Sequence, residues 1–74
     1  MRITIEYCRT RVPDGTLAVI DRICCDAVSH AAAKSIAVML AASRTMPQTP
    51  DIVRILDKNG TEFFRDTIAA PPEQ

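Results

Sequence analysis

Two adjacent cysteines and the single histidine of the chain lie close together in the stretch ICCDAVSHAAAK, residues 23–34. Thiolates and imidazoles bind zinc or act as nucleophile and base, so these residues are candidates for a metal site or a catalytic site. If Cys24 and Cys25 are consecutive in a strand, however, their side chains point to opposite faces and do not converge on one metal. Ser29 and His30 are adjacent at the start of a predicted helix, where neighbouring side chains also diverge. The sequence therefore predicts no catalytic, cofactor-binding or metal-binding residue.

The third cysteine, Cys8, is expected to lie far from Cys24. The predicted strand pairing puts Cys24 opposite Thr4, which is roughly 13 Å from Cys8 at about 3.4 Å per residue. A disulfide needs Cα atoms within about 7 Å. An odd number of cysteines without a CxxC pair is typical of a reducing compartment. We therefore expect three small, half-buried thiols in a cytoplasmic protein that is not an enzyme.

Two turn signals divide the chain. The segments VPDGT, residues 12–16, and DKNGT, residues 57–61, each end in a glycine followed by threonine. Gly15 and Gly60 suit the positive φ that follows a type I turn at the tip of a β-hairpin. The sequence thus predicts two hairpins.

A three-residue loop fixes the register of the first hairpin. It puts Val12 opposite Thr16 and, further from the turn, Glu6 opposite Arg22. Opposite charges then meet on one face, and isoleucines meet on the other. This agreement between turn chemistry and cross-strand pairing supports the register.

The segment between the hairpins, SHAAAKSIAVMLAASRT at residues 29–45, is rich in strong helix formers. Ser29 is a predicted N-cap. Pro47 disfavours helical geometry at the residue before it, so the helix is expected to end near Thr45.

The resulting fold class is α+β, with an antiparallel-rich four-stranded sheet in the chain order β-β-α-β-β and one helix packed on one face. We predict a single domain over residues 1–70 and a disordered C-terminal tail at 71–74. An alanine-rich helix after an acidic residue and the DKNG turn of the closing hairpin complete the pattern. In this order the chain resembles several small uncharacterised bacterial domains. The resemblance spans most of the chain and implies no reaction and no site residues.

The charge balance bears on partners. Nine basic and nine acidic residues cancel, which disfavours binding to phosphate backbones or to an anionic membrane. The longest apolar run is also far shorter than the roughly 20 residues of a membrane span. Nucleic-acid binding is nonetheless kept as an alternative, because strand arginines and aromatic rings could grip and stack on bases. The residues concerned are Arg9, Arg11, Arg22, Arg54 and Arg65, with Tyr7, Phe63 and Phe64. A second alternative is a small metal- or thiol-dependent protein.

The apolar pattern exceeds what one helix can cover. The helix stripe assigned to the sheet consists of Ala32, Ala33, Ile36, Met39, Leu40 and Ser43. Its opposite side is also apolar and carries Ala31, Val38, Ala41 and Ala42. In the strands, one set of apolar residues suits the covered face: Ile3, Ile5, Ile23, Val53, Ile55 and Phe63. A second set is predicted on the other face: Cys8, Ile20, Cys24, Ile52, Leu56 and Phe64.

An apolar surplus of this kind is typical of an interaction surface. The leading hypothesis is a small non-enzymatic interaction domain, which forms a homodimer or binds another protein. The predicted interface consists of Ile20, Ile52, Leu56 and Phe64 on the sheet, or of Val38 and Ala41 on the helix.

Overall fold

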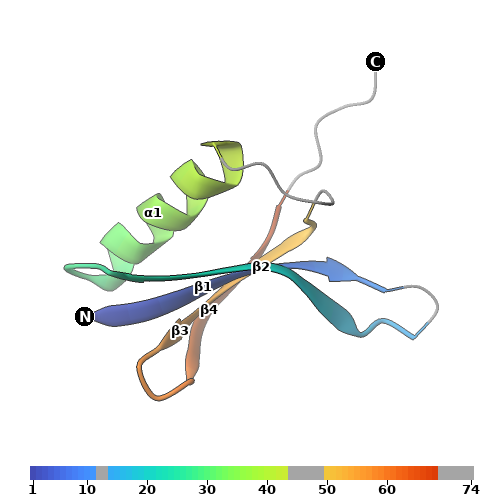
Figure 1. The fold of residues 1–74 in the computed structure, drawn as a ribbon, viewed down its shortest axis with the longest axis horizontal. Coiled ribbons are helices and arrows are strands. Elements are labelled where there is room, and N and C mark those ends of the chain that lie inside the picture. Colours follow the sequence, from blue (N-terminus) through green and yellow to red (C-terminus); the bar gives the residue numbers. More distant parts are fainter. Residues whose placement is uncertain (12–13, 44–49, 69–74) are drawn as a thin grey trace.

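The computed structural model describes residues 1–11, 14–43 and 50–68. Its elements are β1 (Arg2–Thr10), β2 (Leu17–Asp26), α1 (His30–Ser43), β3 (Ile52–Asp57) and β4 (Glu62–Thr67). The four strands form one antiparallel sheet in the order β2-β1-β3-β4, and α1 lies across one face of it (Figure 1). This is the α+β fold that the sequence predicts. The predicted tail at 71–74 lies outside the described residues.

The first hairpin has the predicted register over most of its length. The predicted pairs are present: Thr4–Cys24, Ile5–Ile23 and Glu6–Arg22. Gly15 has a φ of 72° and Gly60 a φ of 82°. Both predicted turn glycines are therefore confirmed in the left-handed region that residues with side chains disfavour.

Nearer the turn, a β-bulge shifts the pairing of β1 with β2 by one residue. Ile20 is the extra residue on β2. At the turn, the Arg11 amide donates to the Thr16 carbonyl at 2.7 Å. Thr16 is thus bonded to Arg11, and its predicted partner Val12 lies outside the described residues. The prediction missed the register shift because turn chemistry carries no signal for a bulge several residues away.

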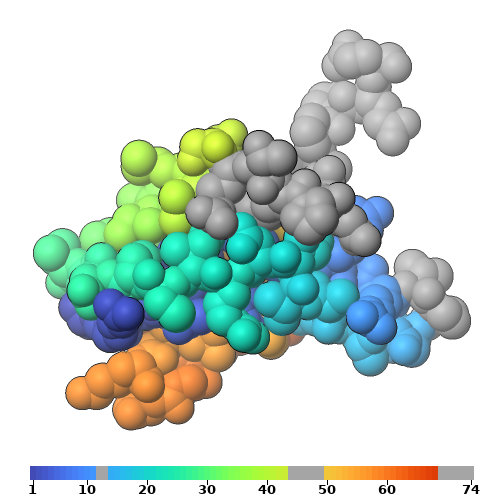
Figure 2. Space-filling view, viewed as in Figure 1, coloured from blue at the N-terminus to red at the C-terminus, as the bar shows by residue number. Residues whose placement is uncertain are grey.

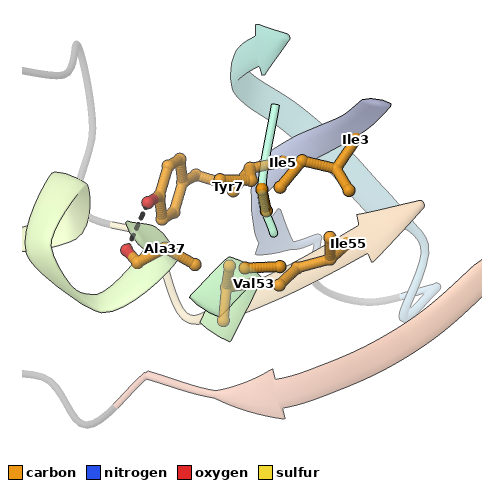
Figure 3. Close-up of a cluster of buried hydrophobic side chains, with 8 residues drawn as sticks. Ile3, Ile5, Tyr7, Ala37, Val53 and Ile55 are labelled. Carbon is orange, nitrogen blue, oxygen red and sulfur yellow. Dashed lines mark hydrogen bonds between the residues drawn. The ribbon is translucent and has the colours of Figure 1, made fainter. Parts of the chain in front are cut away.

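The core lies between α1 and the two central strands. Ile3, Ile5 and Tyr7 alternate along β1 and are fully buried on the face that α1 covers. They pack with Ala27, Ala33, Ala37, Val53 and Ile55 (Figure 3). The Tyr7 hydroxyl donates a hydrogen bond to the Ala37 carbonyl. This bond satisfies a buried phenol and ties the helix to the sheet.

The helix begins as predicted, with the Ser29 side chain accepting a hydrogen bond from the Ala32 amide at 3.1 Å. Its described part ends at Ser43, so the predicted end at Thr45 lies outside the described residues. Its buried side, however, is centred on small residues. Ala33 is buried as predicted, and Ala37 is buried beside it. Contrary to the prediction, Met39 is 69% exposed and Ala41 packs against the core. The helix presents alanines to the sheet because the Tyr7 ring occupies the space beneath Ala37.

Candidate interaction surfaces

One face of the sheet carries no helix, and we call it the open face. Figure 2 shows β2, one of its edge strands, on the surface of the molecule between α1 and the β3–β4 hairpin. Cross-strand partners point to the same side, so the register defines the residues of this face. They include Thr4, Glu6 and Cys8 of β1, Arg22 and Cys24 of β2, Ile52, Arg54 and Leu56 of β3, and Glu62 and Arg65 of β4.

A row of alternating charges crosses the open face. Glu6 is only 5% exposed, and it accepts hydrogen bonds from Arg22 Nε at 2.7 Å and Arg54 Nε at 2.6 Å. Arg54 also lies 4.0 Å from the Glu62 carboxylate, which Arg65 approaches to 2.8 Å. From β2 to β4 the charges therefore run positive, negative, positive, negative, positive.

The arginines keep the central carboxylate ionised. Burial on its own raises the pKa of Glu6, but the hydrogen bonds and positive charges of Arg22 and Arg54 outweigh burial and leave that pKa below its usual value. The sequence predicted the partner in β2. It did not reveal Arg54, because that residue belongs to the other hairpin and meets Glu6 only through the pairing of β1 with β3.

Apolar side chains flank the charged row on both sides. Cys8 is fully buried and pairs with half-buried Ile52 on one side. Half-buried Leu56 pairs with Thr4 on the other. Burial raises the pKa of the Cys8 thiol, so this sulfur is not an activated nucleophile.

Of the six apolar residues predicted on this face, Cys8, Cys24, Ile52 and Leu56 are found there, and the last two belong to the predicted interface. Ile20 is half-buried in the bulge, and Val19 instead pairs with Cys8.

Phe64, contrary to the prediction, lies on the helix side of the sheet. It pairs with the core residue Ile55, and the Lys34 ammonium lies 5.0 Å from its ring centroid. A second β-bulge, in the β3–β4 hairpin, breaks the alternation that the prediction assumed. Phe63 therefore also packs towards α1, where its ring stacks on His30 with centroids 4.2 Å apart.

This arrangement bears on the nucleic-acid alternative. The three aromatic residues of the chain, Tyr7, Phe63 and Phe64, all contribute to the helix side. Arg22 and Arg54 bond to Glu6 on the opposite face. Arg22 and Arg54 thus do not share a face with the aromatic rings.

A second surface is a groove between α1 and β4, of about 420 Å³. We call it the α1–β4 groove. Phe64 lines it together with Val38 and Ala41, so residues that the sequence divided between two surfaces meet here. Lys34 and Asp66 supply charged groups in a lining that is otherwise largely apolar. Val38 is 71% exposed.

The cysteines considered as metal ligands or nucleophiles lie apart in the structure. Cys24 lies on the open face, with its sulfur 3.7 Å from the Thr4 hydroxyl, whereas Cys25 packs towards the core on the helix side. Within residues 1–11, 14–43 and 50–68, no group of three or more histidine, cysteine, aspartate or glutamate side chains could hold a metal ion. None of the helices in these segments has the length and apolar character needed to cross a membrane.

The fold and its two surfaces define a small α+β domain whose four-stranded antiparallel sheet is covered by one helix. Comparison of the chain with protein-family models, curated proteins and solved structures found no match. The resemblance to small bacterial domains therefore stays a prediction.

Proposed function

We propose that this chain is a small non-enzymatic interaction domain that forms a homodimer through the open face. The observation that carries the proposal is the self-complementary charge pattern of that face. Glu6 lies directly opposite Arg54 in the pairing of β1 with β3. A two-fold axis parallel to these strands, and midway between them, would set Glu6 of each chain over Arg54 of the other. Opposite charges then meet twice at the centre of the interface. At its margins Arg22 of each chain would lie over Arg65 of the other, whose charge is offset by its ion pair with Glu62.

The same two-fold axis also brings the apolar side chains beside the charged row of one chain against those of the other. Cys8 of one chain would face Ile52 of the other, and Thr4 would face Leu56. Two sheets in this arrangement form an aligned sandwich with their side chains interdigitated. The charged row enters the interface with its charges already paired within each chain, which lowers the cost of removing it from water.

The size of the chain favours such a partner. A domain of this length buries only about 60% of the surface that its unfolded chain exposes. Covering the open face with a second sheet would add a second layer of core. A two-fold interface needs no partner other than the chain itself.

Two further parts of the proposal, the non-enzymatic role and the location in the cytoplasm, rest on the cysteines and His30. The protonated Cys8 thiol and the stacked His30 support a non-enzymatic role. Free thiols at all three cysteines suit a reducing compartment, and we place the domain in the cytoplasm. Nucleic-acid binding is not proposed, because the arginines of the open face are engaged by carboxylates.

Sedimentation equilibrium tests the proposal. The wild-type chain should sediment at twice its 8.1 kDa mass at micromolar concentration. Leu56→Lys should weaken the dimer at least about tenfold, because it puts an unpaired charge into the interface. Val38→Glu, at an exposed position of the helix, is the matched control and should leave the dimer intact. Circular dichroism should show that both variants fold.

Two outcomes would contradict the open-face homodimer. One is a wild-type monomer at high micromolar concentration. The other is dissociation by Val38→Glu with an intact Leu56→Lys dimer, which would move the interface to the helix.

A further inference from the structure

We propose that the α1–β4 groove and the outer edge of β4 together bind an extended segment of another protein, which adds to the sheet as a strand beside β4. This site is separate from the open face and does not depend on the homodimer. Three features support it: the unpaired backbone of an edge strand, the spacing of helix-side residues of β4 along the groove, and the chemistry of the groove lining.

The first feature is the backbone of β4. This strand is the last in the sheet order and, in the part of the chain that the structure describes, pairs only with β3. Amide and carbonyl groups along one side of Glu62–Thr67 thus face outward without a strand partner. Such groups pair readily with an added extended chain.

The second feature is the spacing of the lining. Phe64, Asp66, Thr67 and Ile68 line the groove. Of these, Phe64 and Asp66 lie two residues apart on the helix side of β4, opposite the core residues Ile55 and Val53. From the helix, Val38 and Ala41 line its other wall. A strand beside β4 has the same period of two, so every second side chain would point to the side of Phe64 and Asp66. Those side chains would enter the groove while the backbone pairs with β4.

The third feature is the chemistry of the lining. Exposed Val38, the alanines of α1 and the Phe64 ring favour apolar groups. Lys34 and Asp66 add one charge of each sign, which suits a polar or charged group at a defined position. The fitting partner is therefore an extended segment with apolar residues at alternate positions.

The groove distinguishes the two edges of the sheet. Ile23 and Cys25 of β2 pack against the core cluster, as Phe64 of β4 does. Residues of β4 line the α1–β4 groove, however, and no residue of β2 does. A helical partner in the α1–β4 groove would cover the apolar lining but leave the β4 edge unpaired, so an extended partner accounts for both features.

The probe is a phage-displayed library of random dodecapeptides, selected against the full chain. Enriched peptides should carry apolar residues at alternate positions. In a synthetic copy of an enriched peptide, backbone N-methylation should weaken binding at least tenfold at alternate residues and little at those between them, because only one set of amides faces β4. In a ¹⁵N-labelled chain, the peptide should shift the amide signals of β4 and α1.

Matched variants locate the site. Val38→Glu should weaken peptide binding at least tenfold, whereas Val28→Glu, at a residue that is 94% exposed before the helix, should not change it. Leu56→Lys, which tests the homodimer, should also leave peptide binding unchanged, so the two proposals fail separately.

Three results would overturn this inference. The first is a selection without enrichment. The second is enrichment of apolar residues at helical spacing or binding that is insensitive to N-methylation. The third is a Val38→Glu variant that binds the peptides like the wild type.

Discussion

Replacing Glu6 with glutamine should destabilise the fold by about 2–3 kcal/mol at neutral pH. The Arg54 contact is 2.6 Å long, and the two side chains are 26% and 6% exposed. A hydrogen bond to such a charged group contributes about 1.5–3 kcal/mol. Arg22 is 59% exposed, so solvent screens its contact and limits its contribution to about 1 kcal/mol or less. The glutamine amide keeps one acceptor oxygen and can still accept a hydrogen bond from an arginine. The expected loss of stability therefore lies in the lower part of the range obtained by adding the two contributions.

The effect should depend on pH in a defined direction. The pKa of Glu6 is lowered in the folded state from a usual value of 4.5. A lowered folded-state pKa stabilises the protein above the unfolded pKa, and the stabilisation is lost as pH falls through the folded value. The difference in unfolding free energy between wild type and Glu6→Gln should therefore be complete above about pH 5.5 and shrink progressively below 4.5.

Urea denaturation at a series of pH values measures this difference. Thermal unfolding at pH 7 should show a melting temperature lower by roughly 10–20 °C. Each measurement is repeated at two protein concentrations, since a dimer makes stability concentration-dependent. Glu62→Gln, which loses the half-exposed Arg65 as partner, is the control and should change stability much less. A Glu6→Gln loss below about 0.5 kcal/mol, or one that is constant from pH 7 to pH 3, would refute the reasoning.

Three further predictions concern the hairpin, the core and the thiols. Gly60→Val should lower the unfolding free energy by more than about 1 kcal/mol, because φ at this position is 82°; an unchanged urea midpoint would contradict this. Tyr7→Phe should cost about 0.5–1.5 kcal/mol through loss of its bond to the helix, and a neutral result would show that the hydroxyl does not hold α1. At a protein concentration low enough to keep the chain monomeric, a disulfide reagent should modify exposed Cys24 first, half-buried Cys25 next and buried Cys8 only on unfolding, and early reaction of Cys8 would contradict its burial.

Local signals in the sequence were sufficient to predict the order of the strands and the helix along the chain. The two turn glycines, the Ser29 cap and the alternation of β1 each act over a few residues, and each is found as predicted. The pairing of Glu6 with Arg22 followed because a short turn ties the register of both strands to one loop.

Features that depend on distant segments could not be read in the same way. The Arg54 contact with Glu6 requires the two hairpins to pair through β1 and β3, which neither turn specifies. The bulge in the second hairpin turned Phe64 towards α1, and strict alternation predicted the opposite. The orientation of α1 depends on Tyr7 below Ala37, so the apolar stripe of the helix alone misplaced Met39.

The homodimer through the open face is tested most directly by isotope-filtered NMR on an equal mixture of ¹³C-labelled and unlabelled chains. Only contacts between chains give signals in this experiment. The proposed two-fold axis predicts cross-peaks between the methyl groups of Leu56 and the methyl group of Thr4 of the partner subunit, and between Ile52 and the partner's Cys8. Cross-peaks from Val38 and Ala41 in their place, or no interchain signals from a sample at millimolar concentration, would contradict the open-face dimer.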